Sequence, residues 1–593
     1  MARITGGELL MKCLVNQGVT KVFGIPGGQL TTFIDAISRL GPEEGIEFVM
    51  TRHESANAYM ADAWHRVTGG LAVCTGTIGP GASNMIGGME AANSDNIPLL
   101  AITPQIHTDR SYPFKGSQQQ LDQMTLYKAV TKWNALVNRW DRIPDLVARA
   151  VREAFSGKQG PVHLDIPVDV LFETGDEESV RIAPPEKTRN TSRPNGDSDM
   201  IQKAADLLAK AERPAIHVGA GILRSEAWDE LRELAEYLCC PVITTTGARG
   251  AISEAHPLCL LPGMGGAIMS QSSADVVLVI GCTFSETDFW GKPPYWGTPD
   301  EQIIVQVDID PGSMGLDREV EVGILGDAKA VLAQLLQAVK DIMPKQESRE
   351  FTATMQSVEK TMREGIEEMA ASDALPIHPM RMIKEVREFF GEEANWALDG
   401  GNISLWGLLG GRVYRPRSYL SHTTGASGHL GGGVSMALAA KMAQPDRPAY
   451  VLTGDGAFLF SVMELETASR LALPVVTVVG NDRAYGMIKG AQDMAFEKRY
   501  CGVDFSDIRL DRVAEGMGCF GIRVTDPGEI KPALEKAVES GRPAVLDVVL
   551  DCSANLLPPA LGAICAIWLT GCEGVEPLSM DILMSAVDSI FNK

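Results

Sequence analysis

Short β-branched runs alternate with amphipathic helical stretches over most of this chain, and that alternation limits the folds open to it. Such a pattern is typical of parallel α/β layers, in which each strand is followed by a turn and a helix. We therefore predict an α/β fold of doubly wound parallel sheets. The expected strands lie at residues 21–24, 47–50, 71–74, 99–102, 161–167, 215–218, 242–244, 276–280, 303–307, 449–452, 475–479 and 544–548.

A chain of 593 residues is long enough for three or four domains. Residues 186–197 are polar, carry turn residues and lack an apolar period, which indicates a linker. We predict three doubly wound domains and a tail. Their expected bounds are 1–185, 198–344 (a central Rossmann-like domain), 377–550 and 551–593 (a C-terminal extension).

Composition excludes several classes of protein. With 45% hydrophobic and 22% charged residues, the chain is neither disordered nor low in complexity. A net charge of −23 disfavours nucleic acid and anionic membranes as partners. Eleven cysteines without a repeated C-x-x-C spacing favour reduced thiols over a disulfide framework, and no signal-peptide layout is present. We therefore expect a cytoplasmic enzyme.

The strongest chemical signal lies in the third predicted domain. Residues 453–457 (Thr-Gly-Asp-Gly-Ala) follow an apolar strand, so Asp455 is expected at the carboxyl end of the sheet, where open α/β sheets bind ligands. A second strand ends at residues 480–486, again rich in glycine. Glycines let backbone amides approach a diphosphate, and a carboxylate suits Mg²⁺. The alternative is that Gly-Asp-Gly forms an ordinary turn.

This pair of segments resembles the signature of the thiamine diphosphate (ThDP) enzymes, Gly-Asp-Gly followed at a distance by Asn-Asn. The resemblance implies ThDP and Mg²⁺ as cofactors. It assigns the metal to Asp455, Asp482 and the backbone carbonyl of Ala484, and position 482 holds Asp where the family has Asn.

Further segments match the family in the expected order. Glu54 occupies the place of the carboxylate that the family sets against the pyrimidine ring of the cofactor. Residues 24–28 and 77–84 resemble its glycine-rich turns, and residues 425–431 resemble the loop that props the cofactor in its bent shape. Residues 399–402 are similar to a segment of oxalyl-CoA decarboxylases and 2-hydroxyacyl-CoA lyases that would meet the diphosphate. The residues that this resemblance assigns to cofactor binding are Pro26, Asn84, Gly401, Asn402, Gly428, Leu430, Gly454, Gly456, Ala457 and Met487.

The resemblance also implies a mechanism and an assembly. Glu54 would favour the imino tautomer of the pyrimidine, and the deprotonated thiazolium would attack a carbonyl and allow a neighbouring C–C bond to break or form. In the family the two cofactor-binding domains meet across a subunit interface. We therefore expect a homodimer or homotetramer.

The substrate is argued from positions that vary within the family. Ala491 replaces the pocket Trp of acetolactate synthases, and residues 281–287 lack both arginines of their flavin-contacting segment, so FAD is not expected. Residues 118–124 and 289–296 are similar to oxalyl-CoA decarboxylases and 2-hydroxyacyl-CoA lyases, which would place Gln118 and Gln119 near the reacting atoms. Each of these two segments has a plain alternative, a polar surface turn or a packed aromatic loop.

We therefore expect a lyase that reversibly cleaves a 2-hydroxyacyl-CoA to formyl-CoA and an aldehyde or ketone. The alternatives are carboligation of 2-oxoacids, as in acetolactate synthases, and a non-catalytic descendant of the fold. The turn at 219–221 suggests ADP or the CoA nucleotide in the central domain, and the extension 551–593 suggests either a lid over an acyl-CoA or a packing strap.

Overall fold

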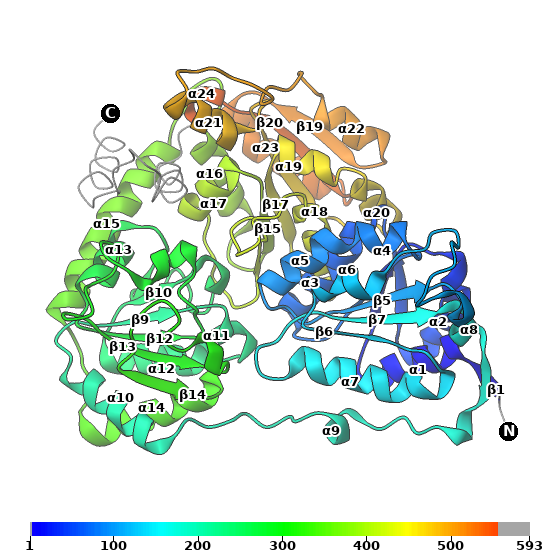
Figure 1. Cartoon of the computed structure of the whole chain (residues 1–593). Helices are drawn as coiled ribbons and strands as arrows, with labels where there is room; N and C mark the ends of the chain where they lie inside the picture. The colour runs from blue at the N-terminus through cyan, green and yellow to red at the C-terminus, as the bar shows by residue number, and fades with distance from the viewer. Residues whose placement is uncertain (1–2, 556–593) are drawn as a thin grey trace.

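The chain forms three α/β units in a triangular arrangement (Figure 1), as described by a computed structural model that covers residues 3–555. Each unit has a six-stranded parallel sheet with helices packed on both faces, so the predicted fold class is confirmed. No helix within residues 3–555 is both long and apolar enough to cross a membrane. The predicted lid lies outside the described residues from position 556 onward.

The first sheet has the strand order β3-β2-β4-β5-β7-β6. Its strands are β2 (Lys21–Gly24), β3 (Glu47–Met50), β4 (Val73–Thr75), β5 (Leu100–Gln105), β6 (Trp133–Leu136) and β7 (Val162–Pro167). The expected strand at 71–74 begins two residues later than predicted. A short antiparallel pair, β1 (Arg3–Thr5) with β8 (Thr174–Asp176), lies outside this sheet.

The central sheet has a different order, β11-β10-β9-β12-β13-β14. The chain therefore winds outward from β9 in one direction and from β12 in the other, as in the Rossmann arrangement. The strands are β9 (Pro214–Val218), β10 (Val242–Thr244), β11 (Cys259–Leu260), β12 (Val276–Ile280), β13 (Ile303–Asp308) and β14 (Val322–Leu325).

The third sheet, β16-β15-β17-β18-β20-β19, repeats the order of the first. Its strands are β15 (Asn395–Asp399), β16 (Tyr419–Leu420), β17 (Ala449–Gly454), β18 (Val476–Asn481), β19 (Phe520–Val524) and β20 (Ala544–Val549). The linker predicted at 186–197 runs between the first and central units, with one helical turn at α9 (Pro185–Thr188) (Figure 1).

The first and third units share one hydrophobic core. It joins α3 (Glu54–Thr68) to α18 (Gly433–Ala443), and both helices present small buried side chains such as Ala58, Ala61, Ala437 and Ala440. Small residues let two helix backbones approach closely, which makes this contact dense. Because α3 begins at Glu54, the packing fixes where that carboxylate lies relative to the third unit.

Candidate active site

Two buried carboxylates meet at the carboxyl edge of the third sheet. β17 ends at Gly454 and α19 (Asp455–Phe460) begins with Asp455; the neighbouring strand β18 ends one residue before Asp482. Asp455 and Asp482 are 4% and 5% exposed. The two oxygens of Asp455 accept the backbone N–H groups of Gly456 and Arg483, each at 2.8 Å.

The environment of this pair is that of a cation site. Burial raises the pKa of Asp455, and the neighbouring Asp482 raises it further, because both disfavour a second negative charge at this edge. A hard divalent cation between the carboxylates offsets both effects. The donor chemistry therefore fits Mg²⁺. The proposed third ligand, the carbonyl of Ala484, lies in a buried residue that forms a β-bridge with Asp504.

Glycines line the same edge where loops approach one another. A Cβ atom on Gly456 would lie 2.9 Å from the ring of Tyr485, and one on Gly400 would lie 2.8 Å from the amide nitrogen of Gly454. Gly401 faces Met487 in the same way, at 3.1 Å. The missing side chains let these loops pack closely against one another at the edge of the sheet, as a tight backbone cradle for a diphosphate requires.

A second loop is held over this edge by Asp399, the last residue of β15. Its carboxylate accepts the N–H groups of Gly431 at 3.1 Å and Gly433 at 2.9 Å, and burial raises its pKa. Gly428 has a φ of +66°, and Leu430 is half-buried. The loop predicted to prop the cofactor is thus anchored to the strand next to β17.

In the first unit the structure brings Glu54 and Asn84 together. The Asn84 amide donates to Glu54 Oε2 at 2.9 Å. A Cβ atom on Gly76 would lie 3.1 Å from Glu54 Cγ, and one on Gly81 would lie 3.3 Å from its Oε1. The glycine-rich turn therefore makes room for the half-buried carboxylate at the start of α3.

Gln119 joins this turn through a chain of side chains. Thr77 donates to Gln29 Oε1 at 2.9 Å, and Gln29 donates to Gln119 Oε1 at 3.3 Å. The carbonyl oxygen of Gln119 lies only 2.3 Å from where a Cβ atom on Gly79 would be. Gln118 and Pro26 are both exposed in loops of the first unit.

Comparison with protein families finds a match in each of the three units. Residues 4–126 match the N-terminal TPP (thiamine pyrophosphate) binding domain of thiamine pyrophosphate enzymes, residues 201–335 match their central domain, and residues 399–548 match their C-terminal TPP binding domain. The chain belongs to the thiamine diphosphate-dependent enzymes.

Several relatives of this ThDP enzyme are named as acetolactate synthases. A probable acetolactate synthase large subunit of Methanococcus aeolicus is 33% identical, over 94% of each chain. The acetolactate synthase isozyme 3 large subunit of Escherichia coli is 30% identical over 97% of this chain and 100% of its own. An acetolactate synthase of Bacillus subtilis is 31% identical over 93% and 94%. These comparisons give no support to 2-hydroxyacyl-CoA lyase specificity.

The sequence interpretation missed a buried network behind the Glu54 turn. Gln123 accepts the N–H of Gly79 at 2.9 Å and donates to Asp165 Oδ1 at 2.6 Å, while Thr103 donates to the same oxygen at 3.0 Å. Burial raises the pKa of Asp165 to about 6. The signal was available, because Asp165 is a carboxylate within the largely apolar strand predicted at 161–167.

One loop and one helix of the first unit, the loop before α3 and α5 (Ile86–Ser94), are tied to the third unit of this ThDP enzyme. The N–H groups of Arg52 and His53 both donate to Glu464 Oε1 at 3.0 Å, and His429 lies 2.7 Å from Glu90. Glu54 follows His53 directly and Leu430 follows His429. The side chains assigned to the cofactor thus sit next to contacts that lock the units together.

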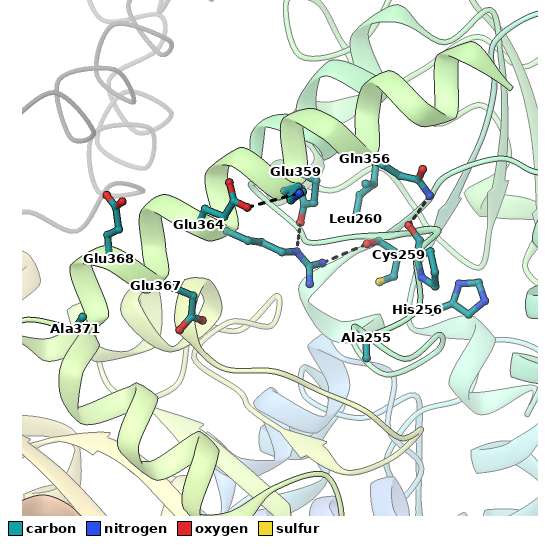
Figure 2. Close-up of a pocket in the computed structure, with 13 residues that line it drawn as sticks. Ala255, His256, Cys259, Leu260, Gln356, Glu359, Glu364, Glu367, Glu368 and Ala371 are labelled. Carbon is teal, nitrogen blue, oxygen red and sulfur yellow. Dashed lines mark hydrogen bonds and ion pairs between the residues drawn. The ribbon is translucent and has the colours of Figure 1, made fainter. Parts of the chain in front are cut away.

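A groove of about 730 Å³ lies elsewhere, between the central unit and α15 (Glu350–Ala370) (Figure 2). It contains none of the predicted site residues. Two charged groups of its wall bind within the protein: Glu359 pairs with Arg363 at 3.1 Å, and Arg363 donates to the carbonyls of Glu254 and Cys259. These contacts fix α15 against the central unit.

Proposed function

We propose that the chain is a ThDP- and Mg²⁺-dependent carboligase that joins 2-oxoacids, in the manner of an acetolactate synthase. The observation that carries the proposal is the buried Asp455–Asp482 pair at the glycine-lined carboxyl edge of the third sheet. Relatives named as acetolactate synthases match the chain over 93–94% of its length. Met487 and Gln492 of α21 (Gly486–Ala495) match the corresponding segment of those synthases and support the same choice, although Ala491 replaces its pocket Trp.

In this proposal each predicted residue has a physical task. Asp455, Asp482 and the Ala484 carbonyl would hold Mg²⁺, and the glycine-rich loop at residues 454–457 would bind the diphosphate. When bound, ThDP supplies an electron sink for breaking or forming the C–C bond next to a carbonyl. The remaining chemistry belongs to the chain.

Glu54 carries the proton-handling role. Its carboxylate hydrogen-bonds the pyrimidine ring nitrogen, and Asn84 orients it by donating to Oε2 at 2.9 Å. Leu430 fills the space beneath the bent cofactor, and Gln119 offers a neutral hydrogen-bonding amide near the reacting atoms. The network of Gln123 and Asp165 holds the turn that lies against Glu54.

The substrate is tested by offering alternatives to the purified enzyme. We expect two molecules of pyruvate and one proton to yield acetolactate and CO₂. Formation of formyl-CoA from 2-hydroxyacyl-CoA thioesters, with no acetolactate from pyruvate, would replace the carboligase proposal by the lyase that the sequence favoured. Either result leaves the ThDP site in place.

The central unit bears on the remaining cofactor proposals. Gly219 and Gly221 pack against the loop after β12, since a Cβ atom on Gly219 would lie 2.2 Å from the Gly281 carbonyl oxygen. This contact accounts for both glycines without ADP or a CoA nucleotide. We keep the proposal that FAD is not a stoichiometric component, and the absorption spectrum of the purified protein tests it. A flavin band at one equivalent per chain would contradict it.

We also propose that the complete site forms between two subunits, with Glu54 from one chain and Asp455 from the other. Mixing two inactive variants, Glu54→Gln and Asp455→Asn, tests this arrangement. In a shared site, about half of the randomly formed dimers contain one chain of each variant, and each such dimer regains one of its two sites, so about a quarter of the wild-type activity returns. If both residues come from one chain, mixing restores nothing.

A further inference from the structure

A buried cluster of three metal-ligating side chains lies in the central unit, apart from the ThDP site. It comprises His217 on β9, Cys282 just after β12, and Asp288 in the short helix η6 (Glu286–Gly291). One nitrogen, one sulfur and one oxygen of these residues all lie within 4.8 Å of one another. The three side chains are buried, and His217 is only 1% exposed.

The cluster occupies the topological switch point of the central sheet. β9 and β12 are adjacent, and the chain leaves them in opposite directions. Doubly wound sheets bind ligands in the crevice at the carboxyl ends of such a strand pair. His217 is one residue from the end of β9, and Cys282 is two residues beyond β12. The fold therefore places these ligands where it usually places a bound group.

Two of the three spacings approach those of a metal shell, each to a different oxygen of Asp288. His217 Nε2 lies 3.2 Å from Asp288 Oδ1, and Cys282 Sγ lies 3.5 Å from Asp288 Oδ2. In a tetrahedral zinc site, bonds of about 2.0–2.3 Å set neighbouring ligand atoms about 3.3–3.8 Å apart. Within the described part of the chain, His217 Nε2 has no partner in hydrogen-bond geometry. A buried ring nitrogen is thus directed into the cluster without a bond to satisfy it.

Surrounding groups hold the three ligands in place. The Asp288 carboxylate also accepts from Ser285 at 3.2 Å, and its backbone carbonyl accepts from the Trp296 indole at 2.8 Å. Gln271 lies 3.4 Å from His217 Nδ1. A metal-bound histidine donates its other N–H to a carbonyl, and a Gln amide can turn to present its oxygen. Trp296 covers the ring of His217 edge-on at 5.0 Å.

We propose that His217, Cys282 and Asp288 bind one zinc-class divalent cation, with water in the fourth position. A thiolate, an imidazole and a carboxylate together select a borderline-soft ion such as Zn²⁺ over Mg²⁺. The site thereby differs in chemistry from the all-oxygen Asp455–Asp482 pair. It stabilises the loop 282–296 on the sheet and is independent of the proposed carboligation.

Cobalt titration of the full-length protein, in the presence of Mg²⁺ and ThDP, tests the proposal. Co²⁺ bound to a thiolate gives a charge-transfer band in the near ultraviolet, which oxygen ligands cannot produce. We expect the band to saturate at one equivalent per chain and to fall when Zn²⁺ is added. Wild-type protein that shows no band at excess Co²⁺ would overturn the proposal and leave a hydrogen-bonded core cluster.

Matched variants locate the site. Cys282→Ala should lose the band, whereas Cys240→Ala, which removes another buried thiol of the same unit, should keep it. His217→Gln should weaken Co²⁺ binding at least about 10-fold, because one direct ligand is lost. A band that survives in Cys282→Ala contradicts the assignment, and the wild-type titration decides the question even if that variant folds poorly.

Discussion

The first and third units have the same strand order, yet they use the carboxyl edge of the sheet for different purposes. In the third, Asp455 and Asp482 are buried together, and two backbone N–H groups bind the carboxylate of Asp455. In the first, Glu54 is half-buried and receives one amide hydrogen bond from Asn84. Under the proposed function, burial and pairing rather than topology set the two carboxylates apart, since Asp455 would bind a cation and Glu54 would handle a proton.

The largest effect is expected from the third unit. Asp455→Asn removes one of two carboxylates from the proposed Mg²⁺ site, so Mg²⁺ binding should weaken at least about 100-fold and activity should be lost. Asp526→Asn, which changes an exposed carboxylate of the same unit, is the control. Calorimetry measures both. Unchanged Mg²⁺ affinity in Asp455→Asn would remove the metal from this edge.

The first unit should respond in the opposite way. Glu54→Gln keeps the shape of the side chain but not its charge, so turnover should fall about 10²- to 10⁴-fold while ThDP binds within a few-fold of wild type. Glu47→Gln on β3 is the control, since this carboxylate is exposed. Steady-state kinetics with a ThDP titration separate the two effects. A variant with wild-type turnover would end the proposed role of Glu54.

The glycine cradle should show a smaller effect on binding alone. Gly456→Ala sets a methyl group 2.9 Å from the Tyr485 ring, so ThDP affinity should fall about 10-fold, equivalent to about 1.4 kcal/mol. Gly516→Ala is the matched control, because no heavy atom from outside its own helix backbone would lie within 4 Å of the new methyl group. Equal affinities in the two variants would show that Gly456 does not face the cofactor.

The smallest effect concerns pH. Burial and then Asp482 raise the pKa of Asp455 to about 8 in the metal-free protein. At pH values between the ordinary pKa of Asp and this raised pKa, the folded state holds a proton on Asp455 that the unfolded chain has released. The stability of the fold should therefore decrease as the pH rises through that range. Asp482→Asn removes the second cause, and the decline in Tm between pH 5 and 8 should shrink by about 1–3 °C. An unchanged decline would mean that the two carboxylates do not interact.

Sequence patterns predicted the interior strands better than the edges. β10 and β12 were placed at their observed bounds because they are apolar and fully buried. The edge strand β3 was also placed at its observed bounds, but the edge strands β6, β14 and β19 were not predicted. Each of these three is half-buried or alternates between buried and exposed positions and is interrupted by Asn or Gly. β15 was also missed, since only three apolar residues lie between its polar ends.

The same limit applies to the candidate site. Motifs local in the chain led to the predictions of Glu54, Asn84 and Asp455: Asn84 and Asp455 follow strands in glycine-rich segments, and Glu54 follows a strand at the position where the family has its carboxylate. The Gln123–Asp165 link and the Glu464 contact with the loop before Glu54 were not predicted, since they join residues far apart in the sequence. Such partners become visible only when packing brings their elements together.

Calorimetric titration of the full-length protein with ThDP, with and without Mg²⁺, tests the central claim most directly. We expect stoichiometric ThDP binding that requires Mg²⁺ and that is lost in Asp455→Asn. If ThDP did not bind in the presence of Mg²⁺, or bound equally tightly without it, the proposed Mg²⁺ and ThDP site would be wrong.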